Sequence, residues 1–453
     1  MGNPSHIVAV FGGAVSGAEA AFQLAERGIK TVVFDQQLLP YGKIEDGLPK
    51  WHAKLRDKEE GRINDKMQHQ NITYVPNIKL GEDIGFEEIA NEWGFSAVLL
   101  ATGAWKDRPL PVDGIDEYID NGMYYQNPFI YWFNHYHEPN FKGQHFDIVD
   151  DTAIVGGGLA SLDVAKVLMI EMVQRKLNEM GHKTNMFSLD RSIVKVLDEL
   201  GLTLEDLGIK GCTLYYRRRV MDMPLSPMAT DTPEKLEKAQ RVREKLLNNF
   251  LTKYLFKMKE CHMPVGKLVE DGKLVGLTFQ QTEVKDGKAI PVDGSEIEVK
   301  SPLVISSIGS IPELIDGIPN EWQTFKIKDY QSCQIEGYEN VFAVGNAVTG
   351  QGNINESLKH GRELSQRIMD EHLSWKETDF QDYLRLKESG VAGQVNQIAE
   401  QFKEHNLVAA DKIDEIMTKV KRFQEKSGYN DDYSAWIKKH LPIRLEELLG
   451  IEH

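Results

Sequence analysis

The sequence predicts an α/β protein with two units built on parallel sheets and a helical extension at the C-terminus. The order of buried strand, glycine-rich turn, helix and second strand begins near residue 6 and begins again near residue 152. This order places consecutive strands side by side in a parallel sheet. From about residue 374 onward the chain is charged and helix-forming, without strand patterns. The length of 453 residues favours two or three domains.

The first unit opens with elements that the turn residues delimit clearly. They are an apolar strand at 6–11, a glycine-rich turn at 12–17, a helix at 18–27 that Gly28 ends, an apolar strand at 30–35 and a later buried strand at 95–102.

The second unit repeats this order with an insertion. Its expected elements are a strand at 152–155, a glycine turn at 156–158, a helix at 162–172, a polar helical insertion at 173–210 and a strand at 212–216. The alternating stretch 274–299 contains Asp-Gly turns and predicts hairpins. Residues 303–308 and 341–344 predict further buried strands.

The first glycine turn matches most of the dinucleotide fingerprint G-x-G-x-x-G. Gly12 and Gly17 take its first and third glycine positions, and Ala14 stands at the second. The N-terminus of the following helix offers unpaired N–H groups to a pyrophosphate. Asp35 ends the next strand, where a carboxylate binds ribose hydroxyls. The whole order favours a dinucleotide site over a plain turn.

The second turn reads Gly156-Gly157-Gly158-Leu159-Ala160-Ser161, with a small serine at the last position. The next strand is followed by Arg217-Arg218-Arg219 instead of an acid. Arginine at this place accommodates the 2′-phosphate of NADP, which an acid would repel. We therefore predict NADP, with NAD and a merely solvated basic run as the alternatives. A flavin would complement a nicotinamide, because it accepts two electrons together and releases them singly.

Charge, hydropathy and cysteine content exclude several classes of function. A net charge of −16 argues against a nucleic-acid surface. No apolar run of about 18 residues and no signal peptide are evident, so we expect a cytoplasmic protein that does not enter membranes. Cys212, Cys261 and Cys333 are far apart in sequence. No metal site and no redox-active disulfide are expected from them.

Several segments in a fixed order carry a resemblance to a known family. They are the first glycine turn, Leu39-Pro40-Tyr41-Gly42, Ala101-Thr102-Gly103, Gly156-Gly157-Gly158 with Leu162-Asp163-Val164-Ala165, Tyr216-Arg217-Arg218-Arg219, Ser306-Ser307-Ile308-Gly309 and Val344-Gly345-Asn346. Over roughly residues 5–370 the chain resembles adrenodoxin reductase, the ferredoxin–NADP reductases of that type and the small subunit of glutamate synthase.

The resemblance implies two Rossmann-like dinucleotide-binding domains, with the NADP domain inserted into a split FAD domain. The implied boundaries are 1–108 and 302–373 for the FAD domain, 109–301 for the NAD(P) domain and 374–453 for the helical extension. We recognise no counterpart of the extension in the family, and the cysteine-rich iron–sulfur segment of the glutamate synthase subunit is absent from the N-terminus. Asn346 replaces an acidic or aromatic residue of the relatives.

The resemblance also implies residue roles. On the FAD side they fall to Gly12, Gly13, Ala14, Gly17, Asp35, Gly42, Lys43, Thr102, Gly103, Gly345, Asn346, Gly352, Asn353 and Ile354. On the NADP side they fall to Gly158, Leu159, Ala160, Arg217 and Arg218. His52 and Asp163 match a family histidine and aspartate and are the candidate catalytic pair, forming a proton relay near the flavin. The alternative is a surface histidine and a local helix cap.

The implied activity is an FAD-dependent NAD(P)H oxidoreductase that passes electrons to a ferredoxin-like or other protein acceptor. Two alternatives stay open: a flavin-dependent reductase of a small molecule, and a non-catalytic flavoprotein subunit of a larger complex. The C-terminal helices either mediate oligomerisation or pack on the FAD domain. The basic segment Lys50, Lys54, Arg56, Lys58 and Arg62 either docks an acidic acceptor or forms a solvated helix face.

Overall fold

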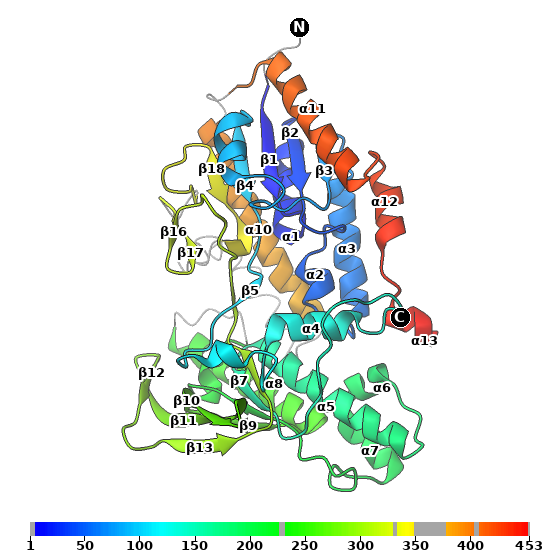
Figure 1. The fold of residues 1–453 in the computed structure, drawn as a ribbon, viewed down its shortest axis with the longest axis vertical. Helices are drawn as coiled ribbons and strands as arrows, with labels where there is room; N and C mark the ends of the chain where they lie inside the picture. The colour runs from blue at the N-terminus through cyan, green and yellow to red at the C-terminus, as the bar shows by residue number, and fades with distance from the viewer. Residues whose placement is uncertain (1–4, 226–231, 329–332, 348–376, 403–406, 452–453) are drawn as a thin grey trace.

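The computed structural model describes residues 5–225, 232–328, 333–347, 377–402 and 407–451. Two units lie one above the other along the long axis, each built around a parallel sheet (Figure 1). The predicted α/β class with two parallel-sheet units is confirmed. None of the helices in the described ranges is long and apolar enough to cross a bilayer.

The first unit contains a five-stranded parallel sheet in the order β18-β4-β1-β2-β3. Its strands are β1 (Ile7–Phe11), β2 (Lys30–Phe34), β3 (Ile72–Val75), β4 (Ala97–Leu100) and β18 (Val341–Ala343). Every residue of β1 and of β4 is buried. This is the pattern of central strands in a sheet that is covered on both faces.

Helices from both ends of the chain cover this sheet. The N-terminal helical elements are α1 (Val15–Ala25), α2 (Lys43–Asp46), α3 (Ala53–Met67) and the π-helical turn η1 (Glu88–Glu92). The C-terminal ones are α10 (Glu377–Phe402), α11 (Ala410–Ser427), α12 (Tyr433–His440) and α13 (Leu445–Leu449).

The two long C-terminal helices lie on opposite faces of the first sheet (Figure 1). Val395 of α10 belongs to the same apolar cluster as Val8 and Val10 of β1. Ile416 of α11 belongs to the cluster of Ala9 and Phe11, whose side chains alternate with those of Val8 and Val10 along the strand. The helical extension is therefore part of the first unit's core.

The second unit contains a five-stranded parallel sheet in the order β6-β14-β7-β8-β9. Its strands are β6 (Met123–Tyr125), β7 (Ala153–Gly156), β8 (Thr213–Tyr215), β9 (Lys257–Lys259) and β14 (Val304–Ser307). Its helical elements are η2 (Ile115–Tyr118), α4 (Gln126–His135), α5 (Leu159–Glu179), α6 (Met186–Arg191), α7 (Ile193–Leu200), η3 (Val220–Asp222) and α8 (Pro233–Tyr254).

The position of β14 bears on one of the implied domain boundaries. The resemblance implies that the second FAD segment begins at residue 302, whereas β14 pairs with β6 and β7 of the second sheet. The return to the first unit comes later, through β15 (Ser310–Ile311), which pairs with the outgoing β5 (Lys106–Asp107). We propose that the boundary lies after Ile311.

The predicted hairpins form an antiparallel sheet attached to the second unit. Its strands are β10 (His262–Glu270), β11 (Lys273–Lys285), β12 (Lys288–Pro291) and β13 (Ile297–Lys300). After β15, the chain forms a small hairpin of β16 (Asn320–Glu321) and β17 (Thr324–Phe325) before β18 and the short 3-10 turn η4 (Gly345–Ala347).

Candidate active site

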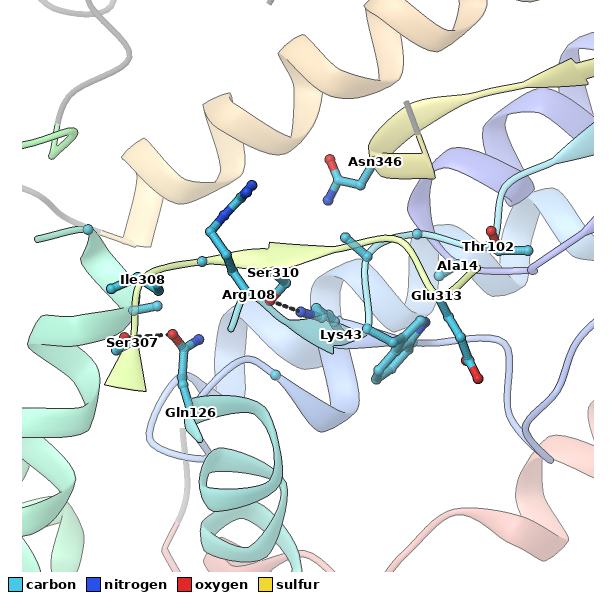
Figure 2. A pocket seen from close by; sticks show the side chains of 18 of the residues that line it. Ala14, Lys43, Thr102, Arg108, Gln126, Ser307, Ile308, Ser310, Glu313 and Asn346 are labelled. Atoms are coloured by element: carbon cyan, nitrogen blue, oxygen red, sulfur yellow. Dashed lines mark hydrogen bonds between the residues drawn. The ribbon is translucent and has the colours of Figure 1, made fainter. Parts of the chain in front are cut away.

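A cavity of about 1290 Å³ lies between the two units, and residues from both glycine turns line it. Ala14, Thr102 and Asn346 come from the first unit, and Gln126 and Ser307 from the second (Figure 2). Both turns follow the carboxyl end of a parallel strand, which is where open α/β sheets bind ligands. The arrangement brings two potential dinucleotide sites to one shared space.

The first turn needs its glycines for close packing. A Cβ atom on Gly12 would come within 2.5 Å of the Ala101 carbonyl oxygen, and one on Gly17 within 1.7 Å of the Gly12 oxygen. Gly13 and Gly17 do not line the cavity themselves, whereas Gly12 and Ala14 do. Ala14 is the N-cap residue of α1.

The alanine that departs from the fingerprint is accommodated by a second glycine. A Cβ on Gly42 would lie 2.8 Å from the Ala14 Cβ, so the Ala14 methyl group rests against the bare face of Gly42. Gly42 has φ of 51° and is the N-cap residue of α2. The glycine at position 42 therefore leaves room for the methyl group that Ala14 adds to the fingerprint.

Asp35 lies at the expected end of β2 and is buried at the cavity wall. Its Oδ2 accepts a hydrogen bond from the Gly13 N–H at 2.6 Å, and its Oδ1 accepts one from the Gln37 N–H at 2.8 Å. Burial raises the pKa of the carboxyl group to about 6, against the lowering effect of these bonds. The carboxylate thus ties the turn to β2 and keeps lone pairs for a ribose.

The wall beside β4 and β18 offers an unsatisfied donor. The Thr102 hydroxyl is buried and has no hydrogen-bond partner among the described residues. Gly345 has φ of 66°, and a Cβ there would lie 2.2 Å from the Ser16 hydroxyl oxygen. Asn346 lines the cavity and accepts a 2.9 Å hydrogen bond from Lys387. Gly352, Asn353 and Ile354 lie outside the described residues.

The second turn is tightly packed at its first two glycines and open at its third. Cβ atoms on Gly156 and Gly157 would lie 2.4 Å from the Ser307 oxygen and 2.2 Å from the Tyr216 ring. A Cβ on Gly158 would meet nothing within 4 Å. That open space lies where the fingerprint lets the backbone approach a pyrophosphate. Leu159 and Ala160, the first residues of α5, also line the cavity.

The three consecutive arginines differ in their surroundings. Arg219 forms a bidentate ion pair with Asp222, with N–O distances of 2.8 and 3.0 Å. Arg217 and Arg218 instead line the cavity. Arg218 donates to the Tyr216 hydroxyl at 3.0 Å and to the Gly287 carbonyl at 3.2 Å. Of these three arginines, the two that the resemblance assigns to the 2′-phosphate line the cavity, while Arg219 pairs with the neighbouring acid.

Lys43 reaches from α2 across the cavity floor to the second unit (Figure 2). Its ammonium donates to Asn127 Oδ1 at 3.0 Å and to Ser310 Oγ at 3.1 Å. Asn127 lies in α4 and Ser310 in β15. Neither residue was predicted from the sequence to belong to the site. No local pattern marks either residue, because each gains its role from a fold contact with a distant segment.

His52 and Asp163 both lie close to a buried lysine. Burial and, to a lesser extent, the Lys166 charge lower the pKa of His52 to about 3. Burial raises the pKa of Asp163 to about 7, which Lys166 opposes. Lys166 pairs with Asp190, and its ammonium lies 4.0 Å from the Trp51 ring centroid. Asp163 lines the cavity. Of the two candidate catalytic residues, Asp163 is therefore the one whose pKa lies near neutrality.

The basic segment predicted either as a docking patch or as a solvated face is only partly exposed, since Lys54 and Lys58 are exposed whereas other members are not. Lys50 and Arg56 are buried, and Arg56 pairs with Glu446 of α13. Arg62 pairs with Glu388 of α10 at 2.9 Å. Both predictions treated the segment as a free surface, but contacts with helices from the C-terminal end engage Arg56 and Arg62. None of the three cysteines, all of which lie in the described part of the chain, forms a disulfide, and Cys212 and Cys333 are buried.

Comparisons with known proteins agree with this geometry. Residues 6–246 match the family Pyridine nucleotide-disulphide oxidoreductase. The NADPH:adrenodoxin oxidoreductase of Arabidopsis thaliana is 25% identical over 329 residues, 65% of each chain. The small chain of glutamate synthase [NADPH] of Bacillus subtilis is 25% identical over 384 residues, 80% of this chain and 66% of that one. The match thus spans about 65% of these relatives' length.

Solved structures share the fold. FprA of Mycobacterium tuberculosis in complex with NADPH superposes with a TM-score of 0.64 and 16% identity, covering 93% of this chain and 91% of that one. The resemblance to adrenodoxin reductase and glutamate synthase relatives is confirmed. Because the family match covers more than half of the 453 residues, the chain belongs to the pyridine nucleotide-disulphide oxidoreductase family.

Proposed function

We propose that this protein is an FAD-dependent NADPH oxidoreductase that passes electrons to a ferredoxin-type protein. The observation that carries the proposal is the single cavity onto which two glycine turns open, one from each unit. The relatives named as NADPH:adrenodoxin oxidoreductase and probable ferredoxin/ferredoxin–NADP reductase support the reaction and the partner.

The residues of the first unit fit FAD. Gly12, Ala14 and the N-terminus of α1 would hold its pyrophosphate. Asp35 would accept from the ribose hydroxyls, and the buried Thr102 hydroxyl would gain the partner that it lacks. When bound, the flavin supplies the capacity to take up two electrons and release them singly.

The residues of the second unit fit NADPH. Gly158, Leu159 and Ala160 would hold the pyrophosphate, and Arg217 and Arg218 would bind the 2′-phosphate through charge-assisted hydrogen bonds. The protein then contributes chiefly by fixing two rings against each other and excluding water. No covalent step on a side chain is required.

Reduction of the purified flavoprotein under anaerobic conditions tests the proposal. Bleaching of the flavin absorbance by NADPH, followed by reduction of added ferredoxin, is the expected result. A protein that binds no FAD, or an FAD that neither NADPH nor NADH bleaches, would overturn it.

Two other activities give different outcomes in the same assay. A small-molecule reductase would reoxidise with a low-molecular-weight acceptor and leave ferredoxin unreduced. The glutamate synthase small chain named among the relatives is the precedent for a subunit that works inside a complex. Such a subunit would need its partner before any acceptor is reduced. The cytoplasmic location and the oligomeric state remain predictions, to be checked by fractionation and by light scattering.

A proton relay through His52 and Asp163 forms part of the proposal. Asp163 lines the cavity and titrates near neutrality, so it is the group suited to exchange a proton there. His52 has a pKa of about 3 and stays neutral, so its role would be to orient neighbouring groups.

A further inference from the structure

Lys43 lies at the junction where two redox rings would have to meet. FAD would extend from the turn at Gly12 and Ala14, and NADPH from the turn at Gly158. Electron transfer requires their rings to approach each other between these turns. Figure 2 shows Lys43 and Ser310 in this intermediate position, between Ala14 and Thr102 on one side and Gln126 and Ser307 on the other.

The Lys43 ammonium is held in place by a hydrogen-bonded network. Besides accepting from Lys43, Asn127 donates through Nδ2 to the Trp105 carbonyl at 2.9 Å and to Ser310 Oγ at 3.0 Å. The backbone N–H of Asn127 donates to both carboxylate oxygens of Asp107 at 3.2 Å. An ammonium group has three N–H donors, and Asn127 and Ser310 use two of them. One donor remains for a ligand in the cavity.

The charge at this place lacks a direct counter-ion within the described part of the chain. Asp107 is close enough to act on Lys43, but the ion pairs of the described residues do not include this pair. A second lysine, Lys387, adds positive charge, since it acts on Lys43 and donates to Asn346. Burial lowers the pKa of Lys43 to about 8, so the group stays mostly charged at neutral pH. A half-buried cation without a direct counter-ion is stabilised when negative charge is placed beside it.

We infer that Lys43 contacts the flavin ring and stabilises the negative charge that reduction leaves on it. The inference rests on the proposed function, because it assumes that FAD occupies the first site. Positive charge close to the ring is one of the means by which a protein tunes a flavin's electronics. Asn127 and Ser310 act as positioning residues, since they fix the ammonium and do not themselves carry charge.

The midpoint potential of bound FAD tests the inference, measured by anaerobic dye equilibration in the full-length flavoprotein. In Lys43→Met we expect the ratio of reduced to oxidised flavin at a fixed potential to fall about tenfold, which for a two-electron couple is about 30 mV. Lys43→Arg keeps the charge and should stay close to the wild type. Lys79→Met removes another lysine of the cavity wall, but one paired with Glu82 and Glu313, and should leave the potential unchanged.

Two readouts keep the test decisive if Lys43→Met loses FAD. Asn127→Ala frees the ammonium without removing it and should lower the potential by less. In the wild type, the potential should fall with pH more steeply above about pH 8, where Lys43 deprotonates. An unchanged midpoint potential in Lys43→Met would overturn the inference. If Lys43→Met does not retain FAD, the inference is overturned when the potential of the wild type shows no added slope near pH 8. In both cases NADPH would still bleach the wild-type flavin, so the proposed function would stand. A chain without FAD would instead refute the proposed function.

Discussion

Removal of Arg444 should destabilise the first unit strongly. Arg444 bonds Glu45 of α2 through Nη1, at 2.5 and 2.7 Å, and Glu60 of α3 through Nη2 at 2.8 Å. The three side chains are 9 to 11% exposed. Breaking a buried ion pair by removing one partner costs about 3–5 kcal/mol, because the remaining charge stays buried. We expect this loss of unfolding free energy in Arg444→Met.

The pH dependence of the loss follows from the two carboxyl groups. Burial and the nearby Glu45 raise the pKa of Glu60 to about 8. A raised pKa in the folded protein contributes stability that is complete below the unfolded value and lost as the pH rises through about 8. Without Arg444, the protonated Glu60 can still donate to Glu45 at about pH 6. The cost of the substitution should therefore be larger at about pH 9 than at about pH 6.

Urea unfolding, followed by tryptophan fluorescence at both pH values, measures this effect. Lys426→Met is the matched control, because it removes a cation from an exposed ion pair with Asp83 and should cost about 0–1 kcal/mol. A loss below about 1 kcal/mol for Arg444→Met, or a loss that does not change with pH, would refute the reasoning.

Three further predictions concern the cavity. Arg217→Ala should weaken NADPH binding by about 1.5–3 kcal/mol, the range for a hydrogen bond to a charged group, and should leave NADH binding nearly unaffected. Equal losses of affinity in titrations with both coenzymes would remove the case for recognition of the 2′-phosphate. The rate of flavin reduction should show a transition near pH 7 that Asp163→Asn abolishes and His52→Gln keeps, since their pKa values are about 7 and about 3; stopped-flow profiles with the opposite result would return the role to His52. Gly42→Ala should weaken FAD retention, because its φ is 51° and the new methyl would meet Ala14, and adding Ala14→Gly should restore part of the affinity in fluorescence titrations; no rescue would contradict the contact.

The parallel-sheet framework could be predicted because local sequence encodes it. The apolar runs of β1, β2, β7 and β8 lie within a residue or two of their expected bounds, and the glycine turns follow where predicted. The strand character of β14 was expected, but its pairing with β6 and β7 of the second sheet could not be read from the sequence. Apolar composition reveals that a strand is buried, but it does not reveal which sheet buries it.

In the candidate site, too, some residues could be predicted from local sequence and others could not. A motif fixes, relative to a strand end, the positions of Gly12, Asp35, Gly158, Arg217 and Arg218. The Lys43 network depends on contacts between α2, α4 and β15, whose sequence separations carry no pattern. Burial likewise escaped the sequence reasoning at Lys50 and Arg56, because a charged helix face normally indicates solvent.

The helical extension connects the core of the first unit to the flavin side of the cavity. A parallel sheet needs apolar cover on both faces, and here α10 covers one face and α11 the other. Beyond them, the Trp436 indole donates to the Leu38 carbonyl at 2.7 Å, and Tyr433 donates to Asn64 Oδ1 at 2.8 Å, the oxygen that also accepts from Tyr41. Leu38 and Tyr41 belong to the segment that leads into Gly42 and Lys43. The extension thus fixes the segment on which FAD would rest, and its charged contacts at Arg444 serve the same end.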